Sequence, residues 1–199
     1  MGNVYHLEDI VSYCKCPLRQ KYRSWGAQES KIDARQAVEI AASGSIEAYL
    51  KESAKPNASR VKALDMATKA YKSILGYYDN NHVFDGSTLF TQHFNHGLIL
   101  IRRFDEMINP VFDRPVHGSL DMSYQLDDDV VLGKISGLIV FNDKSNTERR
   151  YGVVLVGANE TNKTTWGRVY EGFTYGVMRR ALKGMRSYPL HLISIDPHT

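Results

Sequence analysis

Two cysteines, Cys14 and Cys16, are the first residues in the chain whose type and spacing could support chemistry. Thiolates two residues apart can bind a metal ion or take part in redox exchange. A structural zinc site needs four ligands, however, and this chain has two cysteines in total and no His-x₃-His or second cysteine pair to complete the set. An iron–sulfur cubane cluster likewise needs four thiolates. We therefore expect free thiols here, with no metal and no cofactor.

Two histidines, His93 and His96, lie three residues apart in a segment that is predicted to be helical. This spacing places both imidazoles near one helix face, where they can share a metal ion. No pair of acidic residues lies nearby in the sequence to complete such a site. We therefore expect these rings to have surface or core roles.

Composition places the chain among ordinary globular proteins. Its 199 residues are 43% apolar and 24% charged, values typical of one well-cored domain, and no apolar run approaches the length of a membrane span. The N-terminal residues have no basic stretch leading into an apolar core, so they do not indicate a secretory signal. We expect an intracellular, cytoplasmic protein with no membrane partner. The formal net charge of +3 is compatible with a polyanionic partner.

Apolar residues recur at helical spacing in three segments, residues 34–53, 58–79 and 86–109. Asn57 or Ser59 can cap the second of these helices. In the second segment one face is predicted to carry Val61, Leu64, Thr68, Tyr71, Leu75 and Tyr78. In the third it is predicted to carry Phe90, Phe94, Gly97, Ile101, Phe104 and Ile108. We expect core helices.

The second half of the chain is rich in β-forming residues. Runs at residues 114–126, 130–142 and 149–159 are separated by turn-forming segments and predict three antiparallel strands in a meander. A helix over 165–184 and a short strand over 190–196 follow. The predicted fold is therefore α+β, a single domain over 1–199 with a helical subdomain at 31–109 and a β-rich core at 110–199.

This order of helices, three strands, helix and strand resembles the PD-(D/E)xK nuclease fold, in its RecB and Cas4-like branch. Four short segments resemble the landmarks of that branch. They are Cys16-Pro17 followed by basic residues, the segment 44–50 in place of a Gly-x-x-x-His helix, the segments 133–136 and 156–159 in place of Gly-x-Ile-Asp and Asp-x-Lys strands, and 171–175 in place of a Gln-x-x-x-Tyr helix.

The resemblance implies which residues should hold a divalent cation and orient water, and here those positions are degenerate. Such a nuclease uses two acidic groups, often a histidine, and a lysine. At those positions, and at the Gln position of the last motif, the chain has Ala48, Ser136, Gly157, Asn159 and Glu171. The pattern predicts a pseudoenzyme, a nuclease-like scaffold without catalysis. Four of these residues, Ser136, Gly157, Asn159 and Glu171, are predicted to converge at one edge of the sheet.

A second alignment of the chain with the motifs of this family, the alternative register, keeps two catalytic residue types. It places the Gly-x-Leu-Asp acid at Asp121 and the lysine at Lys134. A further alternative is a migrated site formed by Asp121 with Glu160 and Lys163, the last two in the loop before the last helix. Either arrangement would make the protein an active metal-dependent deoxyribonuclease, and this alternative stays open here.

Basic residues gather in the two segments that flank the nucleic-acid groove in the family this chain resembles. We predict that they contact phosphates, with Tyr175 available to stack on a base. The residues are Lys15, Arg19, Lys21, Arg23, Arg168, Tyr175, Arg179, Arg180 and Lys183. The competing interpretation is that these charges only keep the protein soluble. The resemblance implies a subunit of a DNA- or RNA-processing complex of phage or mobile-element origin. A protein-binding adaptor or inhibitor is the second alternative, and the oligomeric state stays open.

Overall fold

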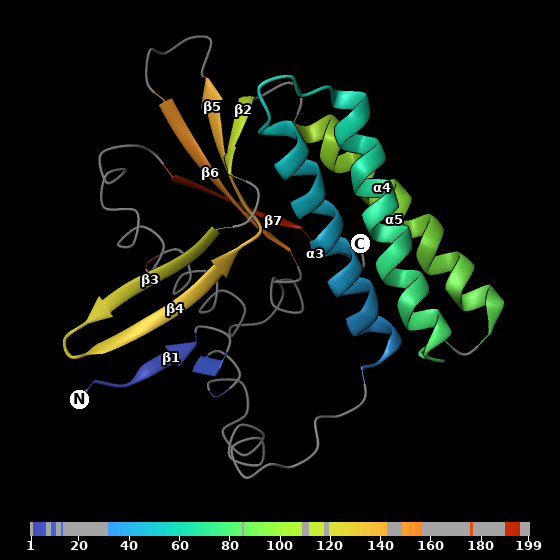
Figure 1. Cartoon of the computed structure of the whole chain (residues 1–199), viewed down its shortest axis with the longest axis horizontal. Coiled ribbons are helices and arrows are strands. Elements are labelled where there is room, and N and C mark those ends of the chain that lie inside the picture. Colours follow the sequence, from blue (N-terminus) through green and yellow to red (C-terminus); the bar gives the residue numbers. More distant parts are fainter. Residues whose placement is uncertain are drawn as a thin grey trace. The chain divides into compact units, whose positions relative to one another are not determined.

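The computed structural model describes part of the chain and divides it into two compact units (Figure 1). The described residues are 2–6, 9–10, 13, 32–84, 86–108, 112–117, 120–142, 149–156, 176 and 190–195. One unit comprises Met1–Lys31, Asp121–Lys134 and Glu160–Ser187; the other comprises Ile32–Leu120, Ile135–Asn159 and Tyr188–Thr199. No helix within the described ranges is long and apolar enough to cross a membrane. The content of helices and strands confirms the predicted α+β class.

Three helices of the second unit confirm the three predicted helical segments. They are α3 (Ala34–Ser53), α4 (Arg60–Asn80) and α5 (Ser87–Ile108). The side chain of Asp33 caps α3 in a capping box with Gln36. Of the two predicted caps for α4, Ser59 is the one used, since its hydroxyl accepts a hydrogen bond from the backbone N–H of Lys62.

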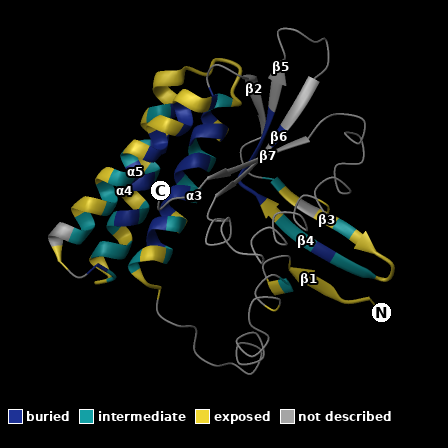
Figure 2. Ribbon diagram, turned by 180° about the vertical axis from the view of Figure 1, so that it is seen from behind, coloured by how far each residue is buried: buried dark blue, intermediate teal, exposed yellow. Residues whose placement is uncertain are grey.

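The helices bury one continuous apolar core along the sides that face one another (Figure 2). α3 packs against both α4 and α5, and also against strands of the sheet described below. Tyr71, Leu75, Ile101, Phe104 and Ile108 are buried, as predicted from their spacing. Small residues fill the contact between α3 and α4, where they let the two helices approach closely: Ala37, Ala41, Ala42, Ala63 and Ala67 are all buried.

One residue of the predicted α4 core face is placed wrongly. Val61 is 79% exposed, whereas Ala63 and Ala67, outside the predicted face, are fully buried. The buried stripe of α4 runs through Ala63, Ala67, Tyr71 and Leu75, so the first turn departs from the predicted face. Val61 lies two residues before Ala63, about 200° around the helix, and therefore on the opposite side from the buried stripe at this end of α4.

A four-stranded sheet completes the second unit. Its strands are β2 (Phe112–His117), β5 (Gly137–Asn142), β6 (Arg149–Val156) and β7 (Leu190–Ile195), in the order β2-β5-β6-β7. The first two pairings are antiparallel and the third, β6 with β7, is parallel. Helix α3 contacts β2, β5 and β6 and therefore covers part of this sheet (Figure 1).

A separate three-stranded sheet belongs to the first unit. It consists of β1 (Val4–His6), β4 (Asp129–Ile135) and β3 (Leu120–Leu126), in the order β1-β4-β3. Strand β1 was not predicted. It pairs in parallel with β4, and the N–H of Val130 donates to the carbonyl of Asn3 at 2.9 Å. Asn3 also donates its backbone N–H to the Asp129 carboxylate at 2.7 Å.

The predicted three-stranded meander is correct in direction but wrong in extent. Each of its first two runs is divided between the two sheets, so that 114–126 contributes to β2 and β3 and 130–142 to β4 and β5. The pairing of β2 with β5 shifts register twice, between Phe112 and Arg114 and again between Pro115 and His117. Such irregularities bend an antiparallel ribbon. Ser136 lies at a bend between β4 and β5, where the second run changes sheets.

Candidate functional site

Two of the five predicted degenerate positions are described by the structure. Ala48 is partly buried on α3, and Ser136 is buried, with 8% of its surface exposed, at the bend that precedes β5. Gly157, Asn159 and Glu171 lie outside the described residues, as do Glu160 and Lys163 of the migrated alternative. The predicted convergence at one sheet edge therefore stays a prediction.

The predicted nucleic-acid-binding residues also lie outside the described part of the chain. They are Lys15, Arg19, Lys21, Arg23, Arg168, Tyr175, Arg179, Arg180 and Lys183. Their interpretation therefore continues to depend on the sequence.

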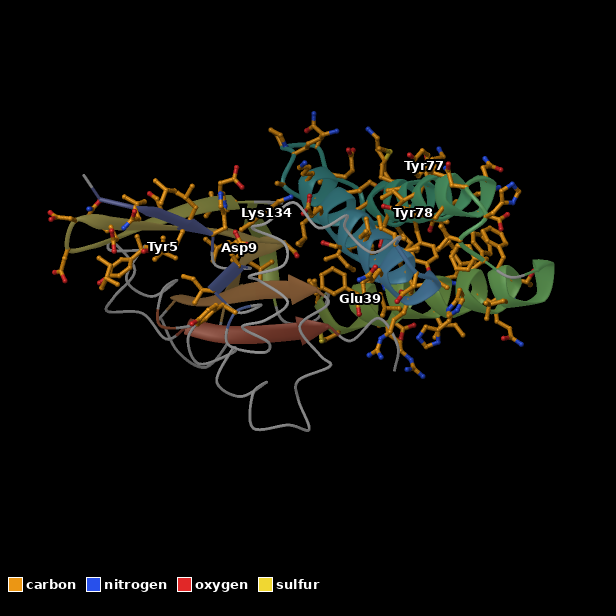
Figure 3. The ribbon with its side chains drawn as sticks, turned by 90° about the horizontal axis from the view of Figure 1, so that it is seen from below. Tyr5, Asp9, Glu39, Tyr77, Tyr78 and Lys134 are labelled. Atoms are coloured by element: carbon orange, nitrogen blue, oxygen red, sulfur yellow. The ribbon has the colours of Figure 1, made fainter. Side chains whose placement is uncertain are left out.

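The alternative catalytic pair lies in the first unit. Asp121 is on β3 and Lys134 is on the adjacent strand β4, and both residues are exposed. Figure 3 labels Lys134. In the part of the chain that the structure describes, no three His, Cys, Asp or Glu side chains are grouped so that they could hold a metal ion. The alternative register also stays a prediction.

The histidines at positions 93 and 96 pack within the helical unit, as expected for core roles. The ring centroid of His93 lies 5.8 Å from that of Phe84, and its backbone carbonyl accepts a hydrogen bond from the Tyr71 hydroxyl at 2.9 Å. The Nε2 atom of His96 is buried and has no hydrogen-bond partner among the described residues.

A group of six polar side chains gathers where the C-terminal turns of α3 and α5 meet the start of α4. We call it the polar cluster; it consists of Tyr49, Glu52, Lys55, Arg60, Lys62 and Asp105. The acids are buried while the three bases remain about half exposed or more. These contacts join charged side chains of α3, α4 and α5 at one end of the helical unit.

Asp105 is the centre of one half of the polar cluster. It is 3% exposed and accepts a hydrogen bond from the Tyr49 hydroxyl at 2.6 Å. Its second partner is Arg60, whose Nε lies 2.9 Å from both carboxylate oxygens and whose Nη2 lies 2.6 Å from Oδ2. This two-point contact joins α3, α4 and α5 and satisfies a carboxylate that would otherwise be costly to bury.

Glu52 is the centre of the other half. It is 4% exposed, and its carboxylate pairs with Lys55 and with Lys62, the latter at 3.1 Å. Lys55 lies in the connection between α3 and α4, and Lys62 lies in the first turn of α4. Glu52 therefore holds the two ends of that connection together.

The protonation states of the cluster follow from these contacts. The hydrogen bond from Arg60 lowers the pKa of Asp105, and the hydrogen bonds from Lys55 and Lys62 lower that of Glu52. Burial and the hydrogen bond to Asp105 raise the pKa of Tyr49, which stays a neutral donor. Both carboxylates of the polar cluster are thus ionised and paired at neutral pH. The cluster therefore stabilises the contact between the helices, with its basic side chains toward solvent. Neither carboxylate is free to act as a general base.

Acidification is expected to weaken this clamp. A carboxyl group whose pKa is lowered on folding stabilises the folded state at pH values above its unfolded-state pKa. This stabilisation is lost as the pH falls through the folded-state pKa. Asp105 and Glu52 both have lowered pKa values, so the melting temperature should fall progressively below about pH 4. Circular dichroism melts of wild type and of Glu52→Gln across this range test the expectation. An equally steep fall in the variant would show that Glu52 has no part in it.

Sequence reasoning missed the polar cluster, although one signal was present. Asp105 lies four residues after Ile101 and three before Ile108, so helical spacing places it on the buried face. An acid on such a face needs a partner. No pattern in the sequence identified Arg60, which lies 45 residues away, as that partner.

Comparison with known proteins adds no family assignment. No protein-family model matches the chain. A search of curated proteins found no match either.

Proposed function

We propose that this protein is a non-catalytic relative of the RecB and Cas4-like nucleases that binds nucleic acid or serves as a subunit of a DNA- or RNA-processing complex. The sheet β2-β5-β6-β7 is the observation that carries the proposal. Its neighbouring strands β2, β5 and β6 pair antiparallel, with β3 and β4 between β2 and β5 in the sequence, and β7 pairs in parallel with β6. A mixed sheet with α3 packed on it is compatible with the fold that the chain resembles.

The chemistry of the corresponding positions supports the loss of catalysis. A hard divalent cation is held by carboxylate oxygens. Ser136 supplies a neutral, largely buried hydroxyl and Ala48 supplies no ligand atom. Since Gly157 and Asn159 are also uncharged, the positions that the family uses for metal and lysine have no charge with which to assemble a phosphate-cleaving centre.

The basic segments 15–23 and 168–183 support nucleic acid as the ligand. Lysine and arginine side chains that neutralise backbone phosphates release condensed counterions, which supplies sequence-independent affinity. Aromatic residues interspersed with them, including Tyr22, Trp25 and Tyr175, can stack on bases. Together these properties favour a weakly specific binder of single strands or of strand ends.

Binding is expected to be micromolar at best and to fall steeply with salt, with a log–log slope of roughly −0.7 per phosphate contact on single strands. Reversing two charges with Arg179→Glu and Arg180→Glu should weaken it strongly, because each change replaces attraction by repulsion. Fluorescence anisotropy with a labelled oligonucleotide at two salt concentrations measures both effects.

A matched control reverses two lysines on the exposed side of α4. Lys69→Glu and Lys72→Glu change the net charge by the same amount at positions outside the basic segments. This variant should lose little affinity. If the two double variants lose affinity equally, total charge and not location governs binding, and the proposed interface is wrong.

The alternatives give different results. An active deoxyribonuclease that uses Asp121 and Lys134 would cut DNA with Mg²⁺ or Mn²⁺, and Asp121→Ala would abolish the cleavage. We expect no cleavage of single- or double-stranded DNA or RNA. A protein that neither cuts nor binds nucleic acid at low salt would leave the adaptor or inhibitor function.

A further inference from the structure

Four basic side chains lie together at the ends of α3 and α4 that the connection 54–59 joins. We call them the basic patch; they are Lys51, Lys55, Arg60 and Lys62. Lys51 is exposed in the last turn of α3. The side chains of Lys55, Arg60 and Lys62 are 59%, 50% and 62% exposed. The four cations are therefore accessible from solvent although three of them also pair with buried acids.

The buried acids fix the direction in which Arg60 can bind. Asp105 occupies its Nε and one hydrogen of Nη2. A guanidinium group has five N–H donors in a rigid plane. Among the described residues, the hydrogens of Nη1 and the second hydrogen of Nη2 have no hydrogen-bond partner, and the side chain is 50% exposed. Although Asp105 offsets part of its charge, an arginine that is already held in one orientation loses less entropy when it binds a second anion.

In this region the acidic side chains of the polar cluster are buried and the basic side chains are exposed. The four bases of the basic patch exceed the two buried acids, Glu52 and Asp105, by two positive charges. Exposed Glu106 acts on Arg60 and reduces this surplus. Since the acids lie beneath and the bases outside, an anion that approaches from solvent meets the cations at shorter distance, and attraction exceeds repulsion.

We propose that the basic patch binds phosphate groups of a nucleic-acid backbone, as a second contact surface in addition to the basic segments 15–23 and 168–183. This proposal rests on the proposed function, because it assigns a further surface to the same class of ligand. Phosphodiesters fit the patch better than isolated carboxylates, since their repeated single charges can occupy the separate cationic groups together and the free edge of Arg60 can contact two oxygens of one phosphate.

The test variant removes the three lysine charges of the basic patch, keeps Arg60 on Asp105, and leaves no buried acid unpaired. It combines Lys51→Gln, Lys55→Gln, Lys62→Gln and Glu52→Gln, which lowers the net charge by two. The control combines Lys69→Gln and Lys72→Gln on α4 and lowers it by the same amount. Anisotropy titrations with a labelled single-stranded oligonucleotide should show a three- to tenfold loss of affinity for the patch variant, a shallower salt dependence by roughly 0.7 per lost contact, and less than a twofold loss for the control.

The outcomes separate this proposal from the proposed function. If the patch variant binds like the control while Arg179→Glu and Arg180→Glu abolish binding, the patch proposal is overturned and the proposed function stands. If wild type binds no oligonucleotide at low salt, both are overturned. A loss confined to the patch variant supports the patch and contradicts the interface placed in the basic segments.

A measurement on the wild type avoids any effect of the substitutions on folding. Lysine acetylation followed by mass spectrometry, with and without the oligonucleotide, reports which amino groups the ligand covers. Lys51, Lys55 and Lys62 should become protected at least threefold relative to Lys69 and Lys72. If saturating oligonucleotide protects the two groups of lysines from acetylation to the same extent, the proposal is overturned.

Discussion

Asp105→Ala is expected to lower the free energy of unfolding by about 2–3 kcal/mol, the largest effect of any single substitution proposed for this protein. The change removes the acceptor of the Tyr49 hydroxyl and the carboxylate that binds Arg60. Arg60 is half exposed and can regain water. The loss therefore comes mainly from the buried hydroxyl that is left without a partner and from the space that the side chain vacates. Urea unfolding followed by circular dichroism measures it.

The control is an acid in an exposed ion pair. Asp65 lies 2.6 Å from Lys69 on α4 and its side chain is 50% exposed. Asp65→Ala should change stability by less than about 0.5 kcal/mol, since exposed pairs contribute little. In the Asp105→Ala background, Tyr49→Phe should cost less than it does in wild type, because the hydroxyl no longer has an acceptor to lose. Equal costs in the two backgrounds would contradict the assigned hydrogen bond.

Gly97→Ala is expected to lower the free energy of unfolding by about 2 kcal/mol, despite the higher helix propensity of alanine. A methyl group at residue 97 would lie 2.0 Å from Cζ and 2.3 Å from the hydroxyl oxygen of Tyr71. Tyr71 is fully buried, and its hydroxyl bonds to the carbonyl of His93. The ring therefore cannot move aside without losing packing and a hydrogen bond. A thermal melt with a two-state fit measures the change.

Gly76→Ala provides the opposite expectation. No atom lies within 4 Å of the position that its Cβ would occupy, so the substitution should stabilise α4 by up to about 1 kcal/mol. Replacing Tyr71 with Leu should reduce the additional cost of Gly97→Ala, since the atoms that clash are those of the tyrosine ring. A stabilising effect of Gly97→Ala in wild type would show that α4 and α5 do not approach as closely as described.

The Asp105→Ala substitution also bears on function, because Asp105 lies next to the basic patch. Asp105 orients Arg60, and Arg60 belongs to the basic patch. Asp105→Ala should therefore change stability and binding together, whereas Gly97→Ala should change stability alone at temperatures where the fold persists. This difference separates an orienting role of Asp105 from a general loss of structure.

The helices were predictable because their signals are local. Apolar residues at steps of three and four residues identified α3, α4 and α5 to within about two residues at each end, and Ser59 was one of two predicted caps. Helical hydrogen bonds join residues four apart, so the sequence of a segment contains most of the information about its own helix. The misplacement of Val61 shows the limit, since the burial of a first turn depends on which neighbour covers it.

The strands and the polar cluster depended on partners far along the chain. Each of the runs 114–126 and 130–142 was predicted as one strand. Each is divided because β3 and β4 belong to the sheet with β1, whereas β2 and β5 belong to the sheet with β6 and β7. Likewise, sequence spacing placed Asp105 on a buried face but did not identify Tyr49 and Arg60 as its partners. The sequence by itself determined the helices, the β-rich character of the second half and the neutral residues at the nuclease-like positions. The tertiary structure decided which strands share a sheet and which charges are buried together, because these depend on contacts between residues that only the folded chain brings within reach.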